Sequence, residues 1–286
     1  MERVPPDEQP AGGVVKSRPN WPAGIFALVW LAVVVGPLLY LVTVSLRSRA
    51  EYLGKSVWEM PDALSLDNYV TVLTGGFGQY LLNNVIVTVA TVAIVVLVTV
   101  PAAYAVVRNT SPFVQKGFTL LLMGLAIPAQ ATIIPVYLMI TRMQLYDTLT
   151  AIILPTAAFA LPVAMLVLVN SLRDVPRELY EAQAIDGAGP LRVLVSLVLP
   201  LARPAIMTVV VYTALNAWNG FLFPLVLTQS ESSRVLTLGL WDFQGQFGTN
   251  VPALLAAVTL SVLPIFAVYL IGRRFLLSGL TAGFGK

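Results

Sequence analysis

The chain has 286 residues, of which 57% are apolar and only 11% are charged, and its mean hydropathy is +0.83. Soluble domains carry about 25% charged residues, so this composition excludes an ordinary soluble globular protein. The sequence contains neither cysteine nor histidine, which removes disulfides, thiolate nucleophiles and the commonest metal ligand. We therefore expect no catalytic site and no metal site. The net charge of +3 is small and its basic residues are scattered, so no nucleic-acid partner is expected.

Six apolar windows follow one another along the chain, and each is long enough to cross a bilayer, which takes about 20 residues. None of them contains Asp, Glu, Lys or Arg. A charge at the bilayer centre costs about 2.5–3.5 kcal/mol, so six membrane spans produce this partition. The predicted spans are residues 23–46, 82–107, 117–140, 151–172, 204–227 and 251–272.

These windows predict an all-α membrane protein with six transmembrane helices. We expect a polar N-terminal tail over residues 1–22, a transmembrane domain over 23–276 and a C-terminal tail over 277–286. The first window is longer than the h-region of a signal peptide, so we interpret it as a retained span.

The distribution of Lys and Arg predicts the orientation in the membrane. Twelve basic residues lie in the N-terminal tail, the second and fourth loops and the C-terminus, against five in the other loops. Cytoplasmic loops carry the excess of Lys and Arg. We therefore expect both termini and the fourth loop in the cytoplasm, and the first loop (47–81) and fifth loop (228–250) outside.

The predicted spans offer no group that could couple transport to an ion gradient. Proton-driven carriers usually keep a titratable side chain within the membrane, and none is present in these windows. A nucleotide site is also missing: Gly54-Lys55-Ser56 imitates the end of a P-loop, but Arg49 stands where its first glycine is required. If the chain transports a solute, the free energy must come from another subunit.

The polar residues in or near the spans are uncharged, and they are Asn83, Asn84, Gln130, Tyr137, Asn170, Tyr212, Asn216, Trp218 and Asn219. Amides donate and accept hydrogen bonds, and aromatic rings cover the apolar faces of sugars, so this set suits a hydroxyl-rich neutral ligand. The alternative is hydrogen bonding between helices and an aromatic belt at the interface. We predict a substrate path at Tyr137, Asn216, Trp218 and Asn219.

The fourth loop, residues 173–203, is predicted to form two short helices. Asp174 can cap a helix N-terminus and Pro176 fits its first turn. Gly187 is a C-terminal stop signal, and Pro190 can begin the second helix. The mixed charge and the many small residues favour docking of a protein partner over a helix lying on the membrane.

Residues 181–188 read Glu-Ala-Gln-Ala-Ile-Asp-Gly-Ala and are followed by Leu199-Pro200. This pattern resembles the EAA loop of ABC-importer permeases, with Gln183 in place of the usual alanine. Further segments resemble the carbohydrate-uptake branch, in particular its maltose-type second permease. They are Leu-Asp-Asn-Tyr at 66–69, Ile-Pro-Val-Tyr at 134–137, Trp-Asn-Gly-Phe-Leu at 218–222 and Gly-Leu-Thr-Ala-Gly at 279–283.

The resemblance implies a non-catalytic permease subunit that imports a sugar, with an oligosaccharide favoured, across a prokaryotic cell membrane. It implies a second homologous permease, a cytoplasmic ATPase dimer that carries ATP and Mg²⁺, and an external solute-binding protein that meets the fifth loop. This chain itself would hold no cofactor. The residues expected to couple to the ATPase are Arg177, Glu181, Ala182, Asp186, Gly187 and Ala188.

Other readings of the sequence remain open at this point. Within the same class, the solute could be a polyamine or glycerol phosphate. From other classes, the chain could be an ion-coupled secondary transporter or a membrane scaffold. The absence of charged residues from the spans disfavours the ion-coupled transporter, and the intact loop motif disfavours the scaffold.

Overall fold

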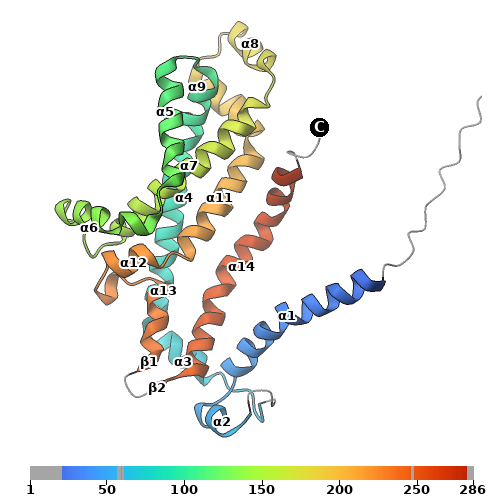
Figure 1. Ribbon diagram of the computed structural model, residues 1–286, viewed down its shortest axis with the longest axis vertical. Coiled ribbons are helices and arrows are strands. Elements are labelled where there is room, and N and C mark those ends of the chain that lie inside the picture. The colour runs from blue at the N-terminus through green and yellow to red at the C-terminus, as the bar shows by residue number, and fades with distance from the viewer. Residues whose placement is uncertain (1–20, 57–58, 60, 246–247, 282–286) are drawn as a thin grey trace, which may run out of the picture.

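The computed structural model describes residues 21–56, 59, 61–245 and 248–281. The chain forms an elongated bundle of helices, with α8 at one end and α2, α3 and a short two-stranded hairpin at the other (Figure 1). These two ends of the bundle are called here the α8 end and the hairpin end.

The elements follow one another as helices with short turns, except for one small hairpin. The first half contains α1 (Trp21–Ser45), α2 (Arg49–Gly54), α3 (Asp67–Val72), η1 (Leu73–Phe77), α4 (Gly78–Arg108), α5 (Pro112–Met123), η2 (Gly124–Ala126), η3 (Ala129–Thr132) and α6 (Ile133–Arg142). The second half contains α7 (Leu149–Arg173), α8 (Arg177–Ile185), α9 (Pro190–Val193), η4 (Leu194–Val198), α10 (Leu199–Leu201), α11 (Arg203–Trp218), α12 (Leu222–Leu227), η5 (Glu231–Ser233), α13 (Leu236–Gly239), η6 (Leu240–Phe243), β1 (Gln244–Gly245), β2 (Gly248–Thr249) and α14 (Val251–Thr281).

Four of the six predicted spans lie on long unbroken apolar helices, namely α1, α4, α7 and α14. Within the described residues, these four are long and apolar enough to cross a membrane by themselves, and up to six spans result if each sharply bent helix pair counts as one. The third and fifth predicted spans are therefore not continuous helices, and the structure supports between four and six spans in a fold that is all-helical as expected.

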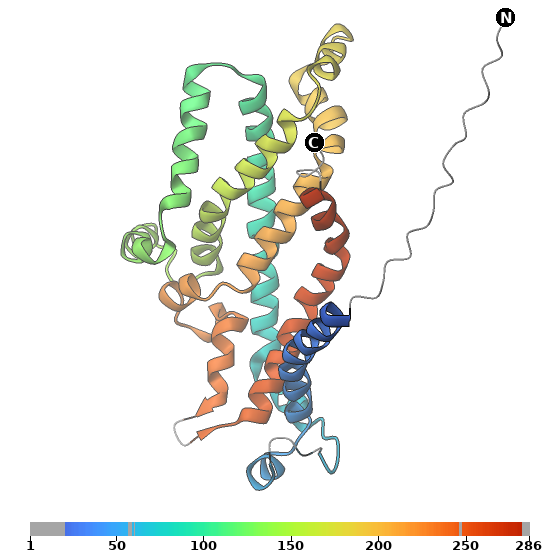
Figure 2. The ribbon, with the colours of Figure 1, turned by 45° about the vertical axis from the view of Figure 1, so that its right-hand side comes forward.

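The third predicted span breaks in the middle. Helix α5 ends at Met123, and Ile127 takes an extended conformation directly before Pro128, because a residue that precedes proline is pushed out of the helical region. The chain then turns, so that the α5–η2 and η3–α6 segments are bent by 99° from one another. Helix α6 consequently projects sideways from the bundle (Figure 2).

The fifth predicted span also breaks, at residues 219–221. Helix α11 ends at Trp218, and the side chains of Asn216 and Asn219 donate to the backbone carbonyls of Tyr212 and Leu215, both at 2.9 Å. Phe221 then leaves the helical conformation before α12 begins. A second sharp bend, of 76°, separates the α9–α10 segment from α11.

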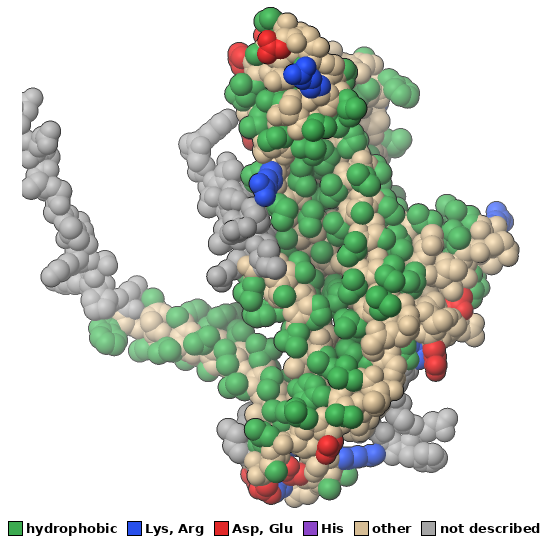
Figure 3. Space-filling view, turned by 180° about the vertical axis from the view of Figure 1, so that it is seen from behind, with side chains coloured by type: hydrophobic (Ala, Val, Ile, Leu, Met, Phe, Trp, Pro, Cys, Tyr) green, Lys and Arg blue, Asp and Glu red, His purple; other side chains and the backbone are tan. Residues whose placement is uncertain are grey.

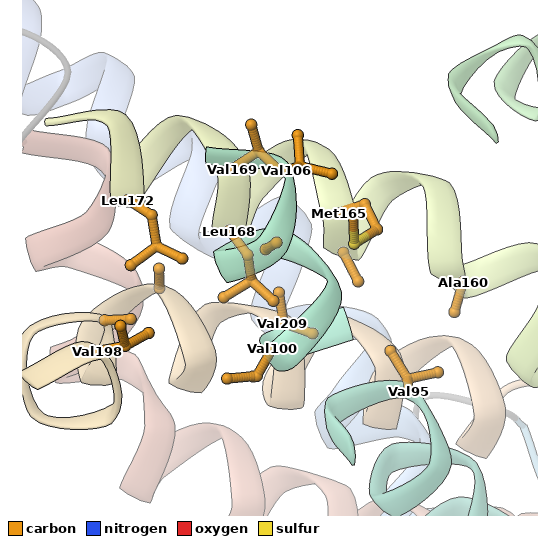
Figure 4. Packing of buried hydrophobic residues seen from close by; sticks show 14 of the residues in the cluster. Val95, Val100, Val106, Ala160, Met165, Leu168, Val169, Leu172, Val198 and Val209 are labelled. Carbon is orange, nitrogen blue, oxygen red and sulfur yellow. The ribbon is translucent and has the colours of Figure 1, made fainter. Parts of the chain in front are cut away.

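The main apolar core lies where α4, α7 and α11 pack together. Figure 4 shows Val95 and Val100 of α4 facing Met165 and Leu168 of α7, with Val209 of α11 closing the cluster. Helix α1 leans away from this core and packs against α14; no residue of its most apolar window is buried. A bilayer or a second subunit must cover such a surface, because soluble monomers rarely expose apolar patches of this size.

Charged side chains gather at the two ends of the bundle and around the projecting end of α6, while apolar side chains cover the face between them (Figure 3). This is the pattern of a membrane-spanning chain. Helix α14 runs on to Thr281, past the domain boundary expected at residue 276. The predicted N-terminal tail lies, for residues 1–20, outside the described residues.

Candidate functional site

The α8 end carries the loop in which the sequence predicts a partner-docking helix. Helix α8 spans Arg177–Ile185, and its N-cap is Pro176. The prediction that Asp174 caps this helix is wrong, because Asp174 is the C-cap of α7. The turn from α7 into α8 therefore takes only a few residues, which places α8 directly above the bundle (Figure 1).

Gly187 ends α8 as predicted, in a motif that needs its conformational freedom. Its φ is +70°, in the left-handed region that favours glycine. The amide of Ala188 donates to the carbonyl of Gln183 at 2.9 Å, and the amide of Gly187 donates to that of Ala184 at 3.1 Å. These two bonds form a Schellman motif, which satisfies the last carbonyls of the helix.

Most of the predicted coupling residues lie on the free surface of this helix and turn. Five of them are exposed, and they are Arg177, Glu181, Ala182, Asp186 and Gly187. Ala188 is half-buried against the main core. Two apolar side chains of α8, Leu179 and Ile185, are also 41% and 87% exposed, so this surface combines charge with apolar area.

Tyr180 anchors α8 to the bundle, a role that the sequence prediction missed. Its side chain is 4% exposed and belongs to the main core. Its ring stacks on that of Tyr104 in α4, with centroids 6.3 Å apart, and the guanidinium of Arg108 lies 4.7 Å from the Tyr180 centroid. Burial raises the pKa of the Tyr180 hydroxyl. The signal available in the sequence was a large aromatic residue on the helix face opposite Ala182.

A pocket of about 360 Å³ opens where the two broken spans meet. It is lined by Ala129, Gln130, Thr156, Phe159, Ala160, Tyr212, Asn216, Gly220, Phe221, Leu222, Phe223 and Pro224. These residues come from η3, α7, the end of α11 and α12. Within a membrane, broken helices are tolerated where they line a cavity or are covered by protein, and transporters use such breaks to build solute sites.

The lining of this pocket is aromatic and amide-bearing, and none of the described residues that line it is charged. Phe159 and Phe223 approach each other with ring centroids 5.6 Å apart. Gln130, Tyr212 and Asn216 supply uncharged donors and acceptors. Aromatic faces beside amides match the alternating apolar and hydroxyl surfaces of a sugar.

Of the four residues predicted to line a substrate path, the structure places Asn216 alone in this pocket. Trp218 is 7% exposed, and its Nε1 donates to the carbonyl of Ser261 in α14 at 3.1 Å. Asn219 is exposed and bonds within its own helix turn. Tyr137 lies on α6, where its ring packs edge-on against that of Tyr146.

Comparison with known proteins agrees with this architecture. Residues 100–280 match the family model of the binding-protein-dependent transport system inner membrane component. A putative ABC transporter permease protein of Caldicellulosiruptor is 37% identical over 94% of this chain and 98% of its own length. The diacetylchitobiose uptake system permease protein NgcG of Streptomyces coelicolor is 32% identical over 90% of this chain and 85% of its own.

The fold is also found among solved structures. A chain of a bacterial ABC transporter involved in the import of the acidic polysaccharide alginate superposes with a TM-score of 0.77 at 24% identity, covering 89% of this chain and 93% of that one. The family match extends over more than half of the sequence and takes in the α8 loop and both broken spans. The chain is therefore a member of the binding-protein-dependent inner membrane component family of ABC transporters.

Proposed function

We propose that the chain is one of two permease subunits of an ABC importer that carries a neutral sugar, with an oligosaccharide favoured, into the cell. The observation that carries the substrate class is the uncharged pocket of aromatic and amide side chains at the meeting of the two broken spans. The relative named for diacetylchitobiose uptake supports an oligosaccharide.

The pocket also separates this proposal from the other solutes considered. A polyamine would require carboxylates to pair its ammonium groups, and glycerol phosphate would require an Arg or a Lys to pair the charge of its phosphate. Among the described residues, no acidic or basic side chain lines the pocket. A sugar needs neither, because its hydroxyl groups pair with amides and its ring faces pack against aromatic rings.

ATP hydrolysis by the partner would drive uptake through α8, at the end of the bundle opposite the hairpin. Closure of a partner ATPase dimer on ATP would move the exposed surface of α8, and Tyr180 would pass that movement to α4 through its stack with Tyr104. Arg177, Glu181 and Asp186 offer both signs of charge on this surface, so the docking cleft is expected to be of mixed charge. The bundle would then alternate between states open to the inside and to the outside.

The assembly can be tested by affinity purification of the tagged chain in mild detergent, followed by mass spectrometry. A second homologous permease and an ATPase should copurify. A chain that comes out alone or as a homodimer, even after crosslinking, contradicts the proposal.

The substrate class can be tested on the solute-binding protein of the same system. Thermal-shift titration with neutral oligosaccharides, uronate oligosaccharides, spermidine and glycerol 3-phosphate should show stabilisation by neutral oligosaccharides. Stabilisation by spermidine or glycerol 3-phosphate instead would overturn the sugar assignment.

A further inference from the structure

A segment at the hairpin end, residues 228–239, has a defined shape although it contains little regular structure. It holds only η5 and the single turn α13, yet Ser233, Val235 and Leu236 are 4% exposed or less. Buried backbone groups in such a segment need partners outside it. Two side chains from distant parts of the chain supply them.

Asp147 provides the first attachment. It lies in the turn between α6 and α7 with a φ of +61°. Its Oδ1 accepts hydrogen bonds from the amides of Gln229 and Ser230, at 2.8 and 3.0 Å, and from the Ser233 hydroxyl at 2.5 Å. The Asp147 amide in turn donates to the carbonyl of Leu227 at 2.9 Å. Bonds to a carboxylate are roughly twice as strong as neutral ones.

Asn83 of α4 provides the second attachment, from the other side. Its side chain is 2% exposed. Its Nδ2 donates to the carbonyls of Ser232 and Arg234, both at 2.8 Å, and its Oδ1 accepts from Gln79 at 2.9 Å. Both donors and one of the two acceptor lone pairs of this amide are thus engaged. These bonds fix the segment against the N-terminal half of α4.

Close packing and one more hydrogen bond complete the attachment. Gly239 lies so near the ring of Tyr80 that a β-carbon there would collide with it. The Thr237 hydroxyl donates to the carbonyl of Gly220 at 2.7 Å, and Gly220 lines the pocket between the broken spans. The segment is therefore tied to α4, to the start of α7 and to the wall of the pocket.

The tip of the same segment is exposed and polar. Gln229, Glu231 and Ser232 are exposed, and Glu231 and Ser232 form one wall of a hollow of about 820 Å³ whose other wall is η1 and the start of α4. Gly75 and Gly76 open the η1 side of this hollow. A rigid polar tip beside a hollow is suited to receive a polar protein surface with a basic group opposite Glu231.

We propose that Asp147 and Asn83 are positioning residues that hold residues 228–239 as a rigid docking element for the solute-binding protein. A displacement of the tip by the bound protein would then move α4 and α7, two helices of the main core. A loosely held loop would instead move by itself. This inference rests on the proposed function, because it requires a binding protein that meets the hairpin end.

The attachment is tested by hydrogen–deuterium exchange on the assembled transporter in nanodiscs. Asn83→Asp keeps the size of the side chain but turns a donor into a carboxylate facing two carbonyls. Asp147→Asn removes the charge and keeps a residue that tolerates positive φ. Asn83→Asp loses the two bonds that Nδ2 donates, and Asp147→Asn keeps an acceptor oxygen but loses the charge that strengthens three bonds. Both variants should speed exchange of the amides of 229–234 by about tenfold.

Gln144→Asn is the matched control. Gln144 lies in the same turn, also with positive φ, but within the described part of the chain its side chain bonds only to the nearby carbonyl of Thr141. Exchange over 229–234 should stay at the wild-type rate in this variant. Unchanged exchange in both Asn83→Asp and Asp147→Asn overturns the attachment.

The docking role is tested by the ATPase rate as a function of binding-protein concentration, with the solute-binding protein that mass spectrometry identifies in the purified system. The variants should raise its half-saturating concentration by about tenfold, as loss of a pre-formed surface predicts, and the rate at saturation should recover. A lower saturating rate at an unchanged half-saturating concentration overturns docking and leaves a purely structural role. If the binding protein does not stimulate the ATPase of the wild-type transporter, the proposed function is overturned as well. The exchange rates of residues 229–234 still decide whether Asn83 and Asp147 hold the segment.

Discussion

The ring of Tyr180 in α8 stacks on the ring of Tyr104 in α4, with centroids 6.3 Å apart and planes 20° from parallel. This contact joins the exposed helix at one end of the molecule to the longest helix of the core. The guanidinium of Arg108, one turn further along α4, also lies over the Tyr180 ring, 4.7 Å from its centroid. Movement imposed on α8 must therefore move α4 or break this stack.

Replacing Tyr180 by alanine should separate α8 from the bundle. Truncating a buried aromatic side chain costs about 3–5 kcal/mol, enough to loosen a helix of nine residues. We expect Tyr180→Ala to insert in the membrane at normal levels but to lose more than about tenfold in uptake, since 1.4 kcal/mol already corresponds to a factor of ten. Uptake per copy of membrane-inserted chain is the measurement.

Tyr180→Phe is the matched control, because it keeps the stack and removes only the hydroxyl. That hydroxyl is buried and has no hydrogen-bond partner among the described residues, so its loss should leave thermal stability equal or higher. If Tyr180→Phe were as defective as Tyr180→Ala, the hydroxyl and not the stack would carry the effect.

The turn at Gly187 should discriminate between neutral and charged substitutions. Its positive φ is tolerated by Asn and Asp at a lower cost than by other residues with a side chain. Apart from its chain neighbours, no described residue has an atom within 4 Å of the position that a β-carbon would take. Gly187→Asn and Gly187→Asp should therefore both fold and insert.

We expect the ATPase to copurify with Gly187→Asn and to be lost from Gly187→Asp, because the added charge would be buried unpaired at the interface. Equal copurification with both variants would show that the turn is not part of the ATPase contact.

The sequence predicted the long spans well because their information is local. An unbroken run of apolar residues such as 82–107 has to form a helix in a membrane, whatever its neighbours are. The breaks after Met123 and Trp218 were not predicted, since hydropathy counts Pro128 and Gly220 as compatible with a span.

Tyr180 was missed for a different reason: its partners Tyr104 and Arg108 are more than seventy residues away in the sequence. Asp147 could not be recognised for the same reason, because its acceptor role depends on Gln229 and Ser233.

The stability that Asp147 contributes should depend on pH only in acid. Hydrogen bonds from the Gln229 amide and the Ser233 hydroxyl hold the pKa of this carboxyl well below its usual range. A carboxyl with a depressed pKa stabilises the folded state above its unfolded pKa, which is about 3.9, and this stabilisation is lost as the pH falls further towards the folded pKa.

The thermal midpoints of the wild type and Asp147→Asn should accordingly differ by a constant amount between about pH 5 and pH 8, and converge below about pH 4. Scanning calorimetry of the assembled transporter over this range is the measurement. Convergence already near pH 6 would show that the carboxyl does not hold these three donors in solution.

The two amides at the end of α11 give the sharpest test of the pocket. Asn216 lies in the last turn of α11, Asn219 is its C-cap, and each bonds to the carbonyl four residues back. Asn216 lines the pocket and Asn219 does not. Alanine at either position costs one exposed hydrogen bond, so the effect on folding should be equal and small, about 0.5–1.5 kcal/mol.

Only Asn216→Ala also removes a polar group that can hydrogen-bond to the hydroxyls of a sugar in the pocket. We expect about a tenfold lower rate of uptake at limiting sugar for Asn216→Ala and a change of less than about twofold for Asn219→Ala, as loss of one ligand hydrogen bond predicts. The measurement is uptake of the oligosaccharide selected by the binding protein, with both variants compared at matched membrane levels. Equal rates would place the translocation route outside this pocket, and a selective defect in Asn219→Ala would reverse the assignment of the two amides.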